Sequence, residues 1–147
     1  MKVKDCMCTE LCYCTPNMTV NEVAKLMNNR HVGCIPVCDN NKNVVGLVTD
    51  RDITLRCVAC DKDEKTTPVS EIMTSSVCCC NQYTEISEVT KMMSDLQIRR
   101  IPVVENNKIV GMLTIGDLAK NENINSKDIG NTFEQICNSG YNSKNAE

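Results

Sequence analysis

Two stretches decide the fold: GLVTDRDI at Gly46–Ile53 and GMLTIGDL at Gly111–Leu118, 65 positions later. Upstream of them, Val3–Val37 recurs at Val69–Val103 with an offset of 66, and 11 of the 35 aligned pairs are identical. A long repeat with its parts in the same order indicates a duplicated structural unit. We therefore expect two equivalent units, with any functional site present twice.

Hydrophobic periodicity predicts the order β-α-β-β-α in each copy, an α/β (α+β) fold. Apolar residues recur at helical spacing from Val20 to Met27 and from Ile86 to Met93, which predicts two amphipathic helices with both methionines in the core. Asx-rich turns between β-rich runs predict hairpins, 34–38 with 44–49 and 100–104 with 109–114. A short strand (11–14, 77–80) opens each copy, and a helix (50–57, 115–120) closes it.

The composition along the chain suggests its domain boundaries. Residues 1–60 form the first repeat, 61–68 a polar linker that ends at a proline, and 69–120 the second repeat. Residues 121–147 are a polar tail with one helical candidate, Ser126 to Cys137, which either packs on the repeats or is largely mobile. Tyr141–Glu147 is expected to be disordered.

Charge and hydropathy exclude several classes of protein. The net charge is -3, and no basic block with interleaved aromatics appears, so nucleic acid is not an expected partner. No stretch has the length and apolarity of a signal peptide or a membrane span, so a cytoplasmic protein without a membrane contact is expected. Without a secretion signal, the twelve cysteines are expected to be reduced thiols that act as small core residues.

Three duplicated motifs resemble those of the cystathionine-β-synthase (CBS) domain family. They are Val-x-[Asp/Glu]-x-Met at 3–7 and 69–73 (with the acidic residue at the third position), Ile-Pro-Val at 35–37 and 101–103, and Gly-x-x-Thr-x-x-Asp at 46–52 and 111–117. The stretch from about Met1 to Lys120 is similar to a tandem CBS pair, or Bateman module. The resemblance implies two repeats packed about a pseudo-two-fold axis, often paired as a homodimer.

The same resemblance implies a function. Such pairs bind adenosine-containing ligands such as AMP, ADP, ATP or S-adenosylmethionine in two clefts, with no cofactor required. They act as sensors that regulate a partner protein, which this sequence does not identify, rather than as enzymes. Ligand binding would shift the population between arrangements of the pair.

The Thr-x-x-Asp element of each copy has two compatible interpretations. Thr49 with Asp52, and Thr114 with Asp117, follow a strand and open a helix, which is the pattern of a capping box. A helix N-terminus also offers N–H groups to a phosphate, and a fixed carboxylate accepts both hydroxyls of a ribose. The resemblance assigns Asp52 and Asp117 to ribose.

The resemblance further implies that each cleft takes its base-facing wall from one copy and its Thr-x-x-Asp from the other. The first cleft would combine Leu11, Cys12, Val32, Gly33, Cys34, Thr114, Gly116 and Asp117. The second would combine Val77, Cys78, Ile98, Arg99, Arg100, Thr49, Arg51 and Asp52.

On this grouping the second cleft could bring three arginines near one phosphate, so we expect it to hold the charged nucleotide. Asp52→Ala should then weaken binding more than Asp117→Ala. Against this, Arg99 and Arg100 are adjacent at a strand entrance and should point oppositely, so a surface role is equally open.

Two alternatives come from other classes. The first is a dimerisation or docking scaffold that binds no ligand. The second is a cysteine-based redox or metal sensor, since Cys57-x-x-Cys60 has the spacing of a metal or redox motif but no second pair completes a zinc site. His31 is the only histidine, so no Ser/His/Asp or Cys/His set of catalytic residues recurs in both copies. No catalytic residues and no metal ligands are therefore assigned.

Overall fold

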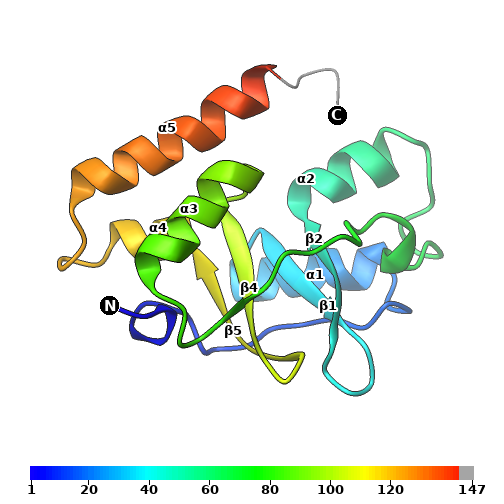
Figure 1. Cartoon of the computed structure of the whole chain (residues 1–147). Coiled ribbons are helices and arrows are strands. Elements are labelled where there is room, and N and C mark those ends of the chain that lie inside the picture. The colour runs from blue at the N-terminus through cyan, green and yellow to red at the C-terminus, as the bar shows by residue number, and fades with distance from the viewer. Residues whose placement is uncertain (143–147) are drawn as a thin grey trace. The chain divides into compact units, whose positions relative to one another are not determined.

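The computed structural model describes residues 1–142, which form two compact units (Figure 1). Unit 1 comprises Met1–Leu11, Cys78–Glu105 and the chain from Val110 onward, and unit 2 comprises Cys12–Val77 and Asn106–Ile109. The units do not coincide with the sequence repeats. The opening segment of each repeat belongs to the unit that the other repeat mainly builds.

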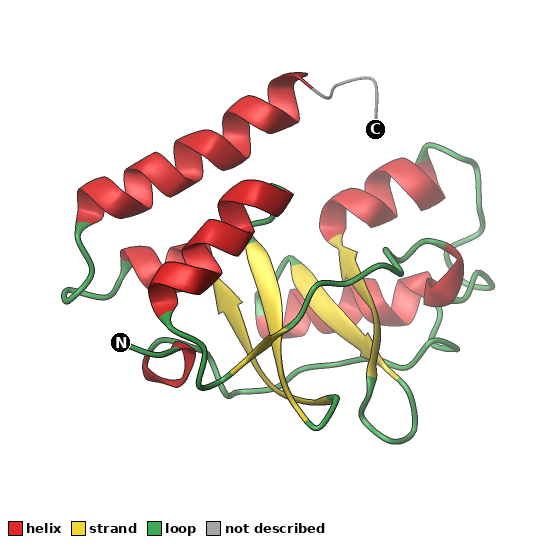
Figure 2. Cartoon of the chain, in the orientation of Figure 1, coloured by secondary structure: helices red, strands yellow, loops and turns green. Residues whose placement is uncertain are grey.

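Unit 2 contains the helices and hairpin of the first repeat (Figure 2). Its elements are α1 (Val20–Arg30), β1 (Cys34–Cys38), β2 (Val44–Thr49), α2 (Asp50–Asp52), the π-helical η2 (Ile53–Val58) that continues α2, and the 3₁₀ turn η3 (Val69–Glu71). β1 and β2 pair antiparallel, with Ile35 opposite Val48, and both side chains are fully buried. The hairpin predicted from the sequence is therefore confirmed to the residue.

Unit 1 repeats this order and adds a long C-terminal helix. Its elements are η1 (Val3–Asp5), β3 (Cys80–Asn81), α3 (Ile86–Leu96), β4 (Arg100–Glu105), β5 (Lys108–Thr114), α4 (Ile115–Ala119) and α5 (Ser126–Asn142). The sheet order is β3-β4-β5, with β3 parallel to β4. The turn between β4 and β5 is Asn106–Asn107, and both residues have the positive φ that a two-residue hairpin turn requires.

The two predicted amphipathic helices are present as α1 and α3, and the sequence explains how α1 begins. Thr19 caps α1, because its hydroxyl accepts from the Glu22 N–H at 3.2 Å while the Glu22 carboxylate accepts from the Thr19 N–H at 3.1 Å. Met27 and Met93 are buried, as expected. His31 is the C-cap of α1 and adopts the left-handed conformation with φ 55°. The only histidine of the chain therefore terminates a helix.

In the opening segment of each repeat, one valine is buried in the core that the other repeat mainly builds. Val3 is fully buried in the core of unit 1, and its N–H donates to the Thr84 carbonyl at 2.9 Å. Val69 is fully buried in the core of unit 2, and its N–H donates to the Met18 carbonyl at 2.8 Å. Each unit is thus completed by a segment that the sequence repeat assigns to the other copy.

The short strands expected at 11–14 and 77–80 are largely absent. The first is reduced to one parallel bridge between Cys14 and Val37, and the second begins only at Cys80. In a parallel ladder, the next hydrogen bond toward Cys12 or Cys78 would need an N–H at residue 36 or 102. Both residues are proline and have no N–H, so pairing stops there.

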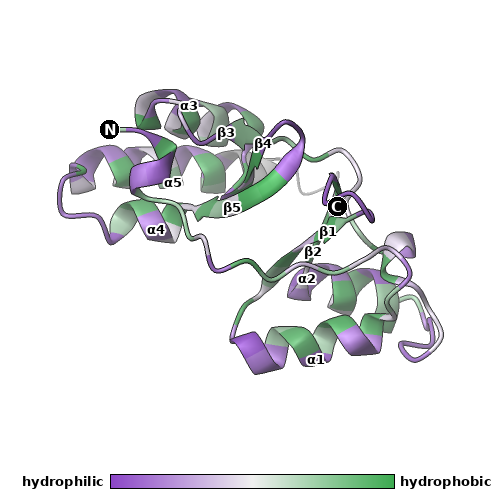
Figure 3. Ribbon diagram, turned by 90° about the horizontal axis from the view of Figure 1, so that it is seen from below, coloured by the Kyte–Doolittle hydropathy of each residue, from purple (hydrophilic) through white to green (hydrophobic). Residues whose placement is uncertain are grey.

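The C-terminal helix is a packed part of unit 1. Ile129 and Ile136 of α5 are buried in the same core as Met93 and Leu118, and α5 lies beside α4 and α3 (Figure 1). Figure 3 shows the alternation of hydrophobic and hydrophilic residues along α5 that a half-buried helix requires. Of the two expectations for the tail, packing is therefore the outcome, with a helix that is longer than predicted. The disorder predicted from residue 141 is wrong for Tyr141 and Asn142, which belong to α5. The remaining residues of that prediction, 143–147, lie outside the described part of the chain.

None of the helices described between Met1 and Asn142 combines the length and the apolarity that crossing a membrane demands. The twelve cysteines all lie in this described part, where they form no disulfide. Cys14, Cys38, Cys57 and Cys80 are buried, as small core residues would be.

Candidate functional site

Both Thr-x-x-Asp elements form capping boxes. The Thr49 N–H donates to Asp52 Oδ2 at 2.9 Å, and the Asp52 N–H donates to Thr49 Oγ1 at 3.1 Å. In unit 1 the same two bonds join Thr114 and Asp117, at 2.9 and 3.0 Å. The capping interpretation is confirmed, and it leaves one oxygen of each carboxylate for another partner.

That remaining oxygen has a different environment in the two units. Asp52 Oδ1 lies 3.8 Å from Arg56 Nη1, and the Asp52 side chain is only 14% exposed. Asp117 Oδ1 accepts no hydrogen bond from residues 1–138, the part of the chain whose side chains are described. Asp117 is therefore the better placed of the two carboxylates to accept a ribose diol.

A second backbone contact joins the hairpin to the capped helix in each unit. In unit 1 the Ile115 N–H donates to the Arg99 carbonyl at 2.9 Å, and in unit 2 the Asp50 N–H donates to the Gly33 carbonyl at 3.0 Å. These are equivalent positions of the two repeats. The start of the first hairpin strand thus lies beside the Thr-x-x-Asp of the same copy.

The region where the first hairpin strand starts beside the capping box is called the corner of each unit below. In unit 1 this corner is hollow and carries two arginines. A cavity of about 260 Å³ is lined by Arg99, Arg100, Thr114, Ile115, Gly116 and Phe133. Among residues 1–138, no carboxylate forms an ion pair with Arg99 or Arg100. Arg99 is exposed and Arg100 is half-buried, so an anion can reach both side chains.

In unit 2 the same corner carries an acidic side chain. The Asp50 carboxylate lies over Gly33, where an added Cβ would be only 3.0 Å from Asp50 Oδ2. Asp50 Oδ1 accepts from the Arg51 N–H at 2.9 Å. The close approach explains the glycine at position 33, and the carboxylate opposes the binding of a second anion at this corner.

These contacts lie within single units. Arg99 and Arg100 line the same cavity as Thr114 and Gly116, and the Gly33 carbonyl bonds the start of α2. The grouping that the resemblance implies joins residues of the two units, so it stays a prediction. Because Arg51 belongs to unit 2, the structure does not gather three arginines at one corner of a single unit. Within a single unit, the corner lined by two arginines is the one that holds the capping box of Asp117, and the expectation that Asp52 matters more stays a prediction.

The predicted wall residues lie around these corners with mixed exposure. Cys12 packs against the core of unit 2, whereas Cys78 and Ile98 pack against the core of unit 1. Leu11, Cys34 and Val77 are half-buried, and Val32 is 40% exposed. Which wall faces which Thr-x-x-Asp stays a prediction.

The thiols give little support to metal or redox chemistry. Burial raises the pKa of both Cys14 and Cys80 to about 12, so neither is a thiolate near neutral pH. In the Cys57-x-x-Cys60 motif, Cys57 is buried and the exposed Cys60 points its thiol to the Leu55 carbonyl at 3.4 Å. No cluster of three or more potential metal ligands occurs among the described residues.

Sequence analysis missed Ile115 and Phe133 as residues of the site. Ile115 occupies the position equivalent to Asp50, so the repeat alignment contained that signal. Phe133, the only phenylalanine of the chain, lies on a helix that the first repeat lacks. A duplicated pattern therefore gave no means to find it.

This fold and the duplicated corner define a class of protein. The CBS domain profile matches residues 3–58 and 69–123, and the chain belongs to the CBS domain family as a tandem pair. The CBS domain-containing protein YhcV of Bacillus subtilis is 41% identical over 134 residues, which cover 91% of this chain and 94% of that protein.

Solved structures that share the fold include the following two. Hypoxic Response Protein I, whose crystal structure holds two coordinated zinc ions, is 26% identical with a TM-score of 0.75, over 82% of this chain and 98% of that one. The CBS domain pair of protein MJ0100, in complex with 5′-methylthioadenosine and S-adenosyl-L-methionine, is 26% identical with a TM-score of 0.74, over the same shares of the two chains.

Proposed function

We propose that this chain is a regulatory module that senses an adenosine-containing ligand, with its preferred phosphate-binding corner in unit 1. The observation that carries the proposal is the cavity in which Arg99 and Arg100 meet the Thr114 capping box. The adenosine ligands in the structure of the MJ0100 pair support the ligand class. The candidates are AMP, ADP, ATP and S-adenosylmethionine.

Each group of the corner has a role in this proposal. The oxygen of Asp117 that the cap leaves unused accepts the ribose hydroxyls, and the guanidinium groups bind phosphate through charge-assisted hydrogen bonds. α4 has only five residues, so its aligned peptide dipoles contribute little. The arginines, rather than the helix N-terminus, supply the positive charge.

The unit 2 corner binds a less charged ligand. Asp50 repels a phosphate there, while the Asp52 carboxylate is close to Arg56. A nucleoside without a polyphosphate, or a ligand with a sulfonium cation such as S-adenosylmethionine, suits this corner better. The two repeats would then respond to different ligands.

Regulation follows from differential affinity. A ligand shifts the population of the module only as far as it binds one conformation more tightly than another. We propose that the module acts as a homodimer on a separate protein and has no catalytic role.

The test is a thermal unfolding screen of the full chain with AMP, ADP, ATP, adenosine and S-adenosylmethionine. A ligand at about 100 times its Kd stabilises the native state by about 2.7 kcal/mol, which raises the melting temperature by several degrees. We expect AMP to raise it more than adenosine does. No shift with any of these ligands would favour the scaffold function instead.

A further inference from the structure

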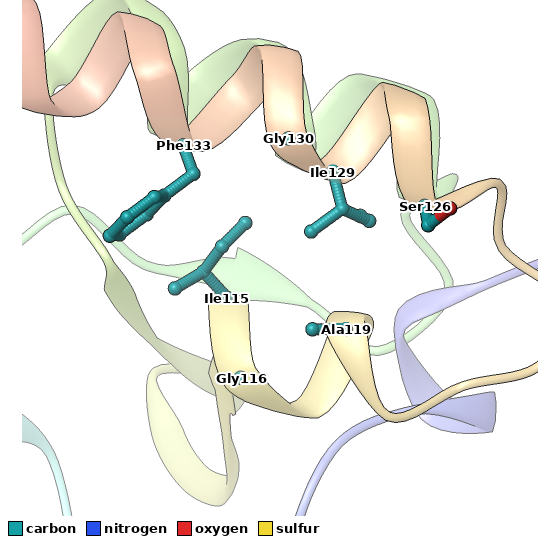
Figure 4. Close-up of a pocket in the computed structure, with 7 residues that line it drawn as sticks. All are labelled: Ile115, Gly116, Ala119, Ser126, Ile129, Gly130 and Phe133. Atoms are coloured by element: carbon teal, nitrogen blue, oxygen red, sulfur yellow. The ribbon is translucent and has the colours of Figure 1, made fainter.

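A second cavity in unit 1 is not used by the proposed nucleotide. It has a volume of about 370 Å³ and lies between α4 and α5 (Figure 4). Figure 4 shows Ile129 and Phe133 of α5 pointing toward α4, with Ile115 between them and Ala119 below Ile129. The lining is almost wholly apolar, and the volume lies within the range of about 300–1,000 Å³ that is usual for ligand sites.

Two exposed glycines form part of the wall of this cavity. Gly116 on α4 and Gly130 on α5 both line it. A Cβ added at Gly130 would meet no atom within 4 Å, so the space beside it is empty rather than filled by a neighbour. Glycine weakens a helix relative to alanine, so Gly130, the fifth residue of α5, lowers the stability of this helix.

The apolar cavity adjoins the arginine cavity. Ile115, Gly116 and Phe133 line both, and Arg99 and Arg100 line only the second. A molecule that lies along α5 past Phe133 therefore reaches the guanidinium groups. The span from Ser126 to Phe133 is about 10 Å at the rise of an α-helix, which suits a chain of medium length.

We propose that the cavity between α4 and α5 binds a single-chain amphiphile whose apolar chain lies between the helices and whose anionic head, a carboxylate or a phosphate, pairs with Arg99 and Arg100. Burial of the chain against Ile115, Ile129 and Phe133 supplies the hydrophobic part of the affinity. The guanidinium groups select an anionic head over a neutral one. This site goes beyond the proposed nucleotide function and does not need Asp117.

The test uses decanoate, decyl phosphate and decan-1-ol, each titrated below its micelle concentration into the full chain by calorimetry. At least one of the two anions should bind saturably, with one molecule per chain, and more tightly than the alcohol. Which anion binds better identifies the head. No saturable binding of either anion overturns the proposal.

Gly130→Leu places a large side chain in the wall of the cavity and should weaken amphiphile binding by about tenfold or more, whereas it should leave AMP binding unchanged. Gly130→Ala is the matched control that adds one methyl group. The Arg99→Gln/Arg100→Gln variant should remove the preference for the anion over the alcohol. Unchanged amphiphile affinity in Gly130→Leu overturns the proposal even where AMP still binds, so its failure is distinct from that of the nucleotide site.

If the Gly130→Leu protein does not fold, NMR spectroscopy of the wild-type chain tests the site instead. In the wild-type chain, the methyl NMR signals of Ile115 and Ile129 should shift on addition of the anion that binds. Signals that stay in place at saturation would locate the ligand elsewhere and overturn the proposal.

Discussion

The backbone N–H of Ile115 donates to the carbonyl of Arg99 at 2.9 Å, and this bond sets the start of α4 beside the entrance of β4. It brings the only two adjacent arginines of the chain to a capping box of their own repeat. The equivalent bond in unit 2 joins Asp50 to Gly33, so the same geometry carries the opposite charge there. The two repeats therefore share this backbone contact but differ in the charge of the side chains around it.

The arginines should act on the phosphate of a ligand and not on its nucleoside. We expect Arg99→Gln/Arg100→Gln to weaken AMP binding by about tenfold or more, because a charge-assisted hydrogen bond is lost. Adenosine binding should change little. Calorimetry with both ligands measures the difference, and an equal loss for both would show that the arginines do not contact phosphate.

The Thr114 hydroxyl should stabilise the fold independently of any ligand. It accepts from the Asp117 N–H at 3.0 Å, so Thr114→Ala should lower the free energy of unfolding by about 0.5–2 kcal/mol. Thr114→Ser keeps the hydroxyl and serves as the control. Urea unfolding without ligand measures both variants, and a Thr114→Ala protein as stable as wild type would contradict the capping role.

Two glycines of unit 1 should respond oppositely to the same substitution. A Cβ at Gly111 would lie 2.9 Å from the Cys8 carbonyl oxygen, so Gly111→Ala should destabilise the chain by about 1–3 kcal/mol. A Cβ at Gly130 meets nothing within 4 Å, so Gly130→Ala should stabilise α5 by about 0.5–1 kcal/mol. Thermal unfolding compares the two, and changes of the same sign would refute the packing described for one of them.

The buried thiols predict a loss of stability at alkaline pH. Cys14 and Cys80 have a pKa raised by burial from 9.0 to about 12, so the unfolded chain releases these protons first. Their stabilisation is complete below pH 9 and is lost as the pH rises toward 12, at no more than about 1.4 kcal/mol per pH unit for each thiol.

Urea unfolding at several pH values tests this dependence. The Cys14→Ala/Cys80→Ala variant is less stable throughout but should show a shallower decline above pH 9. A decline as steep as that of the wild type would assign the alkaline effect to other groups.

The parts of the fold that depend on local pattern could be predicted from the sequence. The hairpin of β1 and β2 and the helices around Met27 and Met93 follow from hydrophobic period and Asx-rich turns. The exchange of Val3 and Val69 between units could not, because the two segments have the same local pattern and only tertiary packing chooses between the cores.

The capping boxes could be predicted from the sequence, but the contacts that each unit makes around them could not. Thr-x-x-Asp identified the capping boxes, since that motif is local. The partner of Arg99 was missed because the contact joins a strand entrance to a helix start sixteen residues later, which no periodicity encodes. Phe133 lies on a helix outside the repeat, where the alignment of the two copies gives no information.

The most direct test of the nucleotide-sensing function is calorimetric titration of AMP into the wild-type chain and into Asp117→Asn and Asp52→Asn. Asparagine keeps one oxygen that can accept the capping hydrogen bond, and it replaces the other carboxylate oxygen and its charge by an NH2 group. We predict saturable binding to the wild type, a loss of about tenfold or more in Asp117→Asn, and a smaller loss in Asp52→Asn. Absence of AMP binding to the wild type, or equal losses in the two variants, would contradict the assignment of the phosphate-binding corner to unit 1.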